Sequence, residues 1–174
     1  MMTTTNLVMI MNELDYISCN IAREKVKQNV KKFLVEKKGY SKEEIITNYE
    51  FDVDANGNVT KVIADLVIRV NGRNAMIVMC APPSTLTPYE MMVLACARVL
   101  NVPLAIATEW RETTILDTYT GQVVGKSLDD IPEKNRLRLE YKKIPEDKVE
   151  KAKRILITYQ YVLHCKCPDF NSRI

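Results

Sequence analysis

The sequence has a single histidine, and this scarcity narrows the chemistry that the chain can perform. The one histidine, His164, lies beside Cys165 and Cys167, which gives three potential zinc ligands where a structural site usually takes four. We therefore expect free thiols in this stretch and no zinc site. Catalysis by a cysteine nucleophile is also disfavoured, because no orienting partner accompanies the histidine in sequence.

Long apolar runs are missing as well. The N-terminal segment offers only residues 7–11, LVMIM, before polar residues intervene, so neither a secretory signal nor a membrane span is predicted. The five cysteines are odd in number and scattered, which argues for reduced thiols and a cytoplasmic location. The sequence also has no large excess of either acidic or basic residues. Its net charge of +3 permits an anionic partner without requiring one.

The sequence has enough hydrophobic residues to form one substantial core, since 47% of the 174 residues are hydrophobic. We expect a single domain over residues 1–174. It consists of an N-terminal extension over 1–19, a core over 20–133 and a C-terminal helix over 145–165. The Met-rich extension either covers the core or contacts a partner, which includes a second copy of the chain.

The order of helix and strand signals favours an α/β fold. Apolar residues recur at helical spacing before Gly39, which predicts a first helix over 20–38. The Asn71-Gly72 pair predicts an antiparallel hairpin between two of the strands. The remaining patterns predict a central mixed sheet flanked by helices. Strands are expected over 45–53, 59–70, 74–80 and 103–108, with a further hairpin over 113–125 that turns at Gly121, and helices over 87–100 and 145–165.

Three stretches carry a resemblance to a known family: REKVKQNVKKFLVEKKGYSKEEII, IADLVIRVNGRNAMIVMCAPP and YEMMVLACARVLNVPLAIATEWRETTILDTYTGQVVG. Together with the Asp-Ile-Pro triplet at 130–132 they span roughly residues 20–133. They resemble the N-terminal nuclease domain of type I restriction enzyme R subunits and its stand-alone relatives, within the PD-(D/E)xK nuclease superfamily. The resemblance implies a restriction-endonuclease-like sandwich and a nuclease-like core over 20–133.

The resemblance also implies a catalytic set, from which this chain departs. In the family an aspartate ends one strand, and glutamate, a spacer and lysine end the next strand before a proline. The two carboxylates hold Mg²⁺ and the lysine helps to activate water. Asp65 matches the aspartate, whereas Met79 stands at the glutamate position and Ala81 at the lysine position. We therefore expect a vestigial site of Asp65, Met79 and Ala81, with no bound metal and no cofactor.

Two further positions depart from the family pattern. The family carries an acidic residue on the first helix, but helical phase turns Glu24 away from the apolar stripe, which Arg23 borders instead. Relatives also carry a glutamine on the helix after the third strand, where this chain has methionine and cysteine in Met92–Arg98. Without a metal ion, the presence of Asp65 requires a different explanation. It is either hydrogen-bonded at a strand end, paired with a neighbour such as Lys61 or Arg73, or part of a vestigial acidic pocket.

Candidate contacts with nucleic acid lie on the first helix, where a basic stripe could follow phosphates: Arg23, Lys27, Lys31 and Lys38. An ordinary solvated face explains the same residues. Trp110 is either an anchor packed within its loop or an exposed contact residue.

Three functions remain open. The first is a catalytically inactive nuclease-fold domain that binds DNA weakly or serves a restriction or DNA-processing system as an accessory part. The second is a structural, self-associating module that forms a homodimer. The third is an active Mg²⁺-dependent endonuclease with relocated ligands. None of the three requires a membrane.

Overall fold

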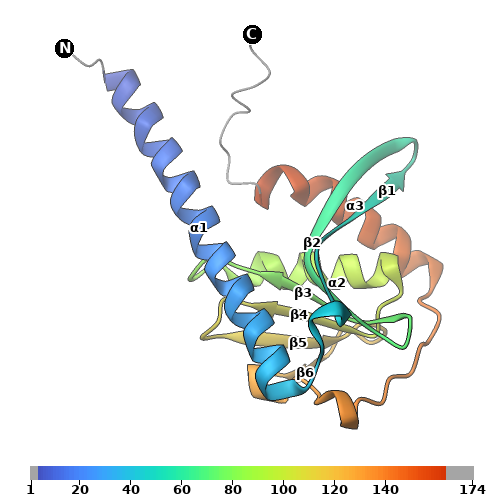
Figure 1. Ribbon diagram of the computed structural model, residues 1–174. Helices are drawn as coiled ribbons and strands as arrows, with labels where there is room; N and C mark the ends of the chain where they lie inside the picture. The colour runs from blue at the N-terminus through green and yellow to red at the C-terminus, as the bar shows by residue number, and fades with distance from the viewer. Residues whose placement is uncertain (1–3, 164–174) are drawn as a thin grey trace.

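The computed structural model describes the backbone of residues 4–163 and the side chains of residues 17–159. The described part contains three helices and six strands (Figure 1). The helices are α1 (Thr4–Lys38), α2 (Leu86–Leu100) and α3 (Glu146–Leu163). The strands are β1 (Ile45–Ala55), β2 (Asn58–Val70), β3 (Arg73–Cys80), β4 (Leu104–Thr108), β5 (Thr113–Asp117) and β6 (Val123–Gly125). Three short 3-10 turns lie in the connections, η1 (Lys42–Glu44), η2 (Leu128–Asp130) and η3 (Lys134–Arg136).

The six strands form one mixed sheet in chain order from β1 to β6. All neighbours are antiparallel except β3 and β4, which run parallel because α2 carries the chain back between them. The hairpins β1–β2 and β2–β3 turn at Asn56-Gly57 and Asn71-Gly72, and all four residues have positive φ, as tight two-residue hairpins require. The predicted hairpin at Asn71-Gly72 is confirmed.

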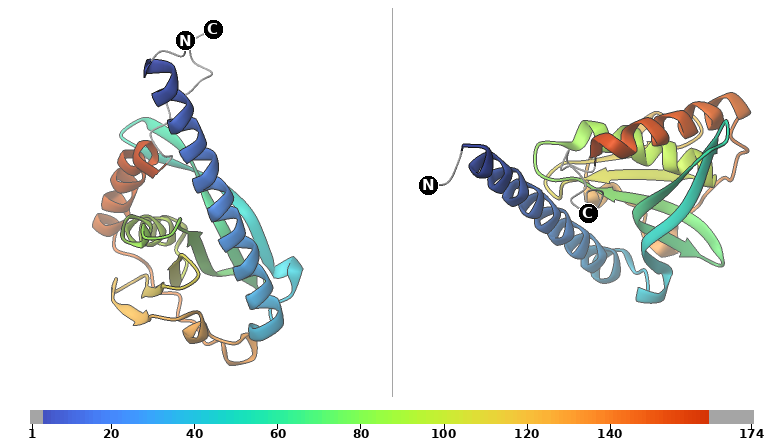
Figure 2. Two further views of the ribbon diagram at one scale, coloured as in Figure 1. Left: turned by 90° about the vertical axis from the view of Figure 1, so that its left-hand side faces the viewer. Right: turned by 90° about the horizontal axis from the view of Figure 1, so that it is seen from above.

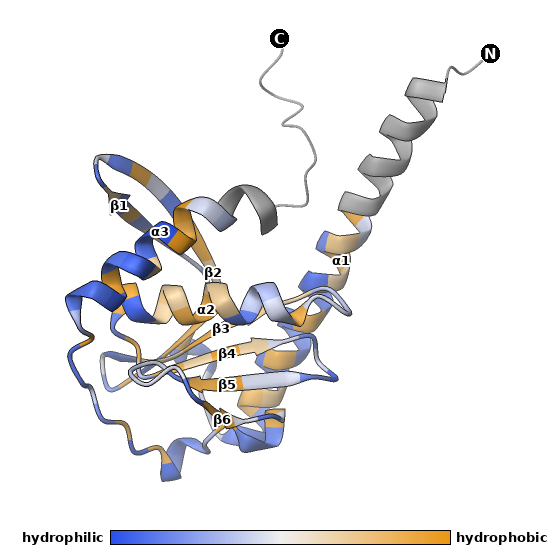
Figure 3. Ribbon diagram, turned by 180° about the vertical axis from the view of Figure 1, so that it is seen from behind, coloured by the Kyte–Doolittle hydropathy of each residue, from blue (hydrophilic) through white to orange (hydrophobic). Residues whose placement is uncertain are grey.

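Helices cover both faces of the sheet, with α1 on one face and α2 and α3 on the other (Figure 2). On the first face Val26, Val30 and Leu34 of α1 pack against alternate residues of the central strands. On the second face α2 and α3 bury a larger cluster that includes Val93 and Leu156. The apolar character of α2 and the central strands is visible in Figure 3. The predicted α/β sandwich, a mixed sheet flanked by helices, is therefore confirmed.

One helix begins earlier than its apolar spacing predicts. α1 runs without interruption from Thr4, whereas the sequence indicates a start near residue 20. The reason is local, because no glycine or proline occurs between Thr4 and Lys38 to end a helix. The N-terminal extension over 1–19 is thus largely continuous with the helix that covers the sheet.

Two more sequence-based expectations concern a zinc site at the C-terminus and a membrane span. The histidine and cysteines at 164–167 lie outside the described residues. Among the helices of the described part, none combines the length and the apolar character needed to cross a bilayer.

Candidate functional site

Asp65 of β2 lies beside the end of β3. Leu66 pairs with Val78 in the antiparallel register, which brings Asp65 to the level of Met79. The backbone N–H of Cys80 donates a hydrogen bond of 2.7 Å to Oδ2 of Asp65. The side chain is buried, with 7% of its residue surface exposed. The two segments on which the expected vestigial site depends therefore lie together, and Asp65 is hydrogen-bonded there.

Arg23 of α1 reaches across to the same place. Its Nη2 donates to Oδ1 and Oδ2 of Asp65 at 3.2 Å each, and its Nε donates to the carbonyl oxygen of Cys80 at 3.0 Å. The guanidinium also lies over the ring of Tyr89 of α2, 5.4 Å from its centroid. One cationic group thus contacts three oxygen atoms from two adjacent strands and links both helix layers to the site.

The ion-pair partner of Asp65 differs from the two that the sequence suggests. Lys61 forms an ion pair of 3.2 Å with Glu50 of the neighbouring strand β1. Arg73 is the first residue of β3, at the end of the strand far from Asp65, with its guanidinium 3.5 Å from the ring centroid of Tyr141. The partner is Arg23, whose side chain faces the sheet because helical phase places it beside Val26 and Val30. Glu24 is turned outward, as the phase predicts.

Burial and charge set the protonation states around the site. Burial opposes the charge on Arg23, but Asp65 and Tyr89 favour it, and the net result is a raised pKa for Arg23. Burial raises the pKa of the Cys80 thiol well above its ordinary value, and the charge of Asp65 raises it further. Burial likewise raises the pKa of Cys96. The site therefore holds a charged guanidinium and neutral thiols at neutral pH.

Met79 and Ala81 belong to the apolar core. They are 2% and 0% exposed and pack in the same cluster as Tyr89 and Met92, so the two replaced positions share one face as expected. The backbone N–H of Ala81 donates to the carbonyl of Thr108 at 2.8 Å and fixes the end of β3 against β4. Cys96 is buried in the same cluster. Thioether, methyl and thiol groups thus occupy the positions where the resemblance implies polar side chains.

The site does not fit the metal ion that a PD-(D/E)xK resemblance implies. Mg²⁺ takes oxygen ligands and gives up its water reluctantly. At this place the only carboxylate identified is Asp65, and Arg23 and the N–H of Cys80 already engage both of its oxygens. In the part of the chain that the structure describes, no group of three or more His, Cys, Asp and Glu side chains could hold a metal ion.

The basic residues of the first helix are mostly engaged within the fold. Lys27 donates to Oδ1 of Asn48 at 2.9 Å and pairs with Glu24, and Lys38 donates to the carbonyl of Asp129 at 2.6 Å. Both lysines are buried, at 7% and 9% exposure. The structure brings Arg23 and Lys27 to the sheet side of α1, next to the apolar stripe, and places Lys38 against the η2 turn. Of the four candidates for phosphate contact, Lys31 lines one surface hollow, together with Lys32 and Lys42, and Lys38 lines another, together with Lys37 and Lys134.

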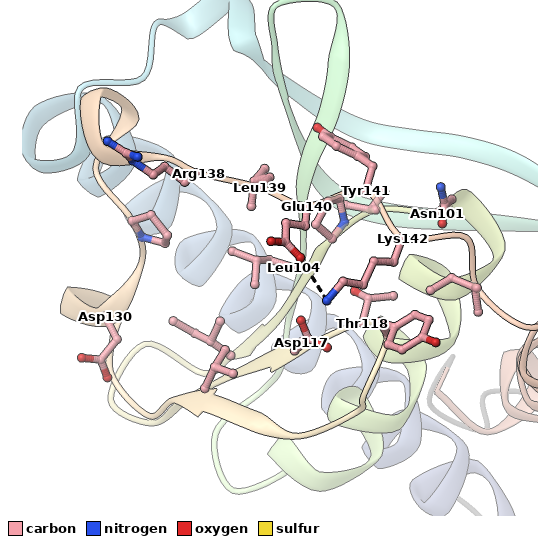
Figure 4. A pocket seen from close by; sticks show the side chains of 17 residues that line it. Asn101, Leu104, Asp117, Thr118, Asp130, Arg138, Leu139, Glu140, Tyr141 and Lys142 are labelled. Carbon is pink, nitrogen blue, oxygen red and sulfur yellow. Dashed lines mark ion pairs between the residues drawn. The ribbon is translucent and has the colours of Figure 1, made fainter.

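A pocket of about 540 Å³ lies away from Asp65, at the opposite end of the strands (Figure 4). The start of β4, the end of β5 and the segment 138–144 form its walls. Lys142 and Glu140 form an ion pair of 3.0 Å beside it, and Asp117 lines the same wall. Both acidic and basic groups line this pocket, so its charge favours neither an anionic nor a cationic ligand.

Trp110 occupies the turn between β4 and β5 and is 40% exposed. Its φ of 83° lies in the left-handed region that bulky residues seldom adopt. The Thr108 hydroxyl accepts from the N–H of Trp110 at 3.0 Å and holds this turn. The side chain is therefore an exposed residue on a fixed turn and not an anchor buried within its loop.

Comparison with known proteins assigns the chain to a family. A family model described as the type I restriction enzyme R protein N terminus matches residues 22–132, which is more than half of the chain. The matched region contains Arg23, Asp65, Met79 and Ala81. Neither the curated proteins nor the solved structures gave a match. The chain belongs to the family of the type I restriction enzyme R protein N terminus.

Proposed function

We propose that this chain is a restriction-system component with a nuclease-like fold that has lost catalysis and acts by contacting DNA. Membership in the family of restriction enzyme R protein N termini supports the connection with a restriction system. The loss of catalysis rests on one observation, the contact of the Arg23 guanidinium with both oxygens of Asp65 and the carbonyl of Cys80.

The charge at the site argues for this loss. The guanidinium already neutralises the single carboxylate, so a divalent cation would have to displace it. Breaking a buried ion pair by removing one partner is unfavourable by about 3 to 5 kcal/mol. Met79 and Ala81 supply neither a second carboxylate nor a lysine to compensate. Hydrolysis of a phosphodiester by metal-activated water therefore lacks its ligands and its activating base.

The DNA contact is weak and electrostatic in this proposal. Lys31, Lys32 and Lys42 line one hollow on the surface of α1 and η1, where Glu36 is the acidic group. Such a patch contacts phosphates and reads no bases. A cytoplasmic site of action agrees with Cys80 and Cys96, which are buried and form no disulfide within the described part of the chain.

A plasmid-nicking assay with Mg²⁺ or Mn²⁺ tests the loss of catalysis. We expect supercoiled plasmid to stay intact at protein concentrations that saturate binding. Cleavage that disappears in Asp65→Ala would overturn this proposal and support an active endonuclease with relocated ligands. The variant Lys151→Glu, altered at an exposed position of α3, controls for contaminating nucleases, since its preparation should behave like the wild type.

Binding of a fluorescent DNA duplex, followed by anisotropy, tests the DNA contact. Affinity should fall steeply between about 50 and 200 mM salt, with a log–log slope near −0.9 for each phosphate neutralised. The double variant Lys31→Glu and Lys42→Glu should bind several-fold more weakly and show a shallower slope. Lys151→Glu makes the same kind of charge change elsewhere and should have little effect. An absence of binding at low salt removes the DNA-contacting part of the proposal.

A further inference from the structure

Thr118 carries a buried hydroxyl that the fold leaves unsatisfied. The residue follows β5 directly and is 1% exposed. Its backbone is fixed, because its N–H donates to the carbonyl of Pro103 at 3.0 Å and its carbonyl accepts from Nε of Arg98 at 3.2 Å. Oγ1, by contrast, is the one buried side-chain nitrogen or oxygen atom among the described residues without a hydrogen-bond partner. A buried hydroxyl in this state is unfavourable and rare in folded proteins.

This hydroxyl belongs to the pocket of about 540 Å³ at the start of β4 and the end of β5. Thr118 lines the pocket, and its side chain converges with those of Asp117 and Lys142 on the same part of it (Figure 4). The volume lies within the range of small-molecule sites, in which a few polar groups orient a molecule against an apolar surface. The unsatisfied hydroxyl is a polar group of this kind.

The lining of the pocket defines the chemistry of the molecule that fits it. Val102, Ile115 and Ile144 line it and are at most 5% exposed, so they offer an apolar surface. The charged lining groups have both signs: Asp117, Asp130, Arg138, Glu140 and Lys142. An ion of either sign would meet a like charge and would lose water against the apolar surface. The lining therefore favours an uncharged molecule.

A movable side chain controls access to the hydroxyl. Oγ1 of Thr118 is closed to solvent, so a ligand reaches it only after a neighbouring group moves. Lys142 extends across the pocket beside Thr118 (Figure 4). Its side chain is 57% exposed, and its ion pair with Glu140 at 3.0 Å is exposed as well. Because such pairs contribute little, Lys142 moves aside at small cost.

We propose that this pocket binds a small uncharged molecule with an apolar body and one hydroxyl or carbonyl group, which forms a hydrogen bond with Oγ1 of Thr118. The threonine hydroxyl both donates and accepts, so it can satisfy either group. The apolar body packs against Ile115 and Ile144. The site is separate from the proposed DNA contact, since the basic hollow of α1 and η1 shares no lining residue with it.

Titration of the full chain with phenol tests the inference. Phenol is an apolar ring with one hydroxyl and is uncharged at pH 7. Carbon–proton correlation NMR of the isoleucine methyl groups should show shifts at Ile115 and Ile144. The methyl signal of Ile63, an isoleucine of β2 at 43% exposure, should stay in place and controls for adsorption to the surface. Benzoate and benzylammonium, the charged analogues, should bind at least about fivefold more weakly.

Three variants test the role of the hydroxyl. Thr118→Val keeps the shape of the side chain and should bind phenol about fivefold more weakly. Without ligand, its thermal midpoint should rise, because no unsatisfied hydroxyl remains in the core. Thr118→Ser keeps the hydroxyl and should bind phenol like the wild type. Thr60→Val is the matched control, because Thr60 is a half-buried threonine of β2 that does not line the pocket.

Four outcomes would overturn the inference. The first is a wild type whose Ile115 and Ile144 signals stay in place at the highest phenol concentration. The second is a shift at Ile63 as large as theirs, which indicates adsorption without a site. The third is a charged analogue that binds as tightly as phenol. The fourth is a folded Thr118→Val variant with the phenol affinity of the wild type, because the hydroxyl would then recognise nothing.

Discussion

Nη2 of Arg23 lies 3.2 Å from each carboxylate oxygen of Asp65, which joins the helix on one face of the sheet to strand β2 across 42 positions of sequence. The pair is largely buried, with side-chain exposures of 22% and 9%. A single interaction thus fixes where α1 crosses the sheet and neutralises the carboxylate that a divalent metal would need.

Removal of the guanidinium should destabilise the fold. In Arg23→Met the carboxylate of Asp65 keeps its hydrogen bond from Cys80 but loses its counter-charge in a buried position. We expect the free energy of unfolding to fall by about 3 kcal/mol, measured by urea denaturation. The double variant Arg23→Met with Asp65→Asn should recover part of this loss, because it leaves no unpaired charge.

Lys32→Met provides the matched control for that experiment. Lys32 also lies on α1 and forms an ion pair with Glu36, but at 3.9 Å and with 72% of its side chain exposed. Exposed pairs of this kind contribute at most about 0.5 kcal/mol. Equal losses in Arg23→Met and Lys32→Met would contradict a special role for the buried pair.

A metal ion should bind beside Asp65 only when ligands are added on β3 and Arg23 is also removed. Met79→Glu with Ala81→Lys places on β3 the residues that the PD-(D/E)xK resemblance implies, but the guanidinium still engages Asp65 in that variant. We expect no Mn²⁺ heat signal for this pair of changes in isothermal titration calorimetry, and a measurable signal once Arg23→Gln is added. The third change frees both oxygens of Asp65 beside the new carboxylate.

A triple variant that carries Met79→Gln in place of Met79→Glu serves as its control. It has the same size and polarity at this position without the carboxylate, so it should bind Mn²⁺ much more weakly. Circular dichroism establishes that each protein is folded, since a polar side chain in this core is destabilising. A folded glutamate variant that ignores Mn²⁺ with Arg23 removed would sink the assignment of this place as the former metal site.

The parts of the fold set by local chemistry were predictable, and the parts set by packing were not. Asn-Gly pairs specify tight turns, so the hairpin at Asn71-Gly72 follows from two adjacent residues. The partner of Asp65 depends on how α1 lies across the sheet, which no local pattern encodes. The spacing of Arg23 and Lys27 indicates one helix face, but only their phase relative to Val26 and Val30 shows that this face turns inward. Family resemblance supplied the strand positions of Asp65 and Met79 and gave no signal for Arg23 as a substitute for the missing ligands.

Buried thiols should be inert in the folded protein. Cys80 and Cys96 are fully buried, and burial raises the pKa of both, so neither forms the reactive thiolate at neutral pH. Alkylation with iodoacetamide at pH 8, followed by peptide mass spectrometry, should leave both unmodified in native protein. Both should react fully in urea. Rapid native modification of Cys80 would mean that the end of β3 opens to solvent, contrary to its packing between α1 and β4.

Tyr40 should make the fold sensitive to alkaline pH. Burial raises the pKa of Tyr40 from 10.0 to about 12, with a smaller contribution from Glu44. The folded state therefore holds this proton more tightly than the unfolded state. The corresponding stability is fully present below pH 10 and is lost as the pH rises from 10 toward 12. The hydroxyl also donates to the carbonyl of Pro132 at 2.8 Å, and ionisation abolishes that bond.

Urea denaturation at a series of pH values from 9 upward, in wild type and Tyr40→Phe, tests this linkage. The variant should lose about 1 kcal/mol at pH 9, because the carbonyl of Pro132 loses its donor. Its stability should then fall less steeply than that of the wild type, so that the two curves converge and cross before the pH reaches 12. Parallel curves would show that Tyr40 ionises equally well in both states, and that the alkaline sensitivity arises from another group. Convergence would instead identify the contact between Tyr40 and Pro132 as the alkali-sensitive link between the end of α1 and the segment that follows η2.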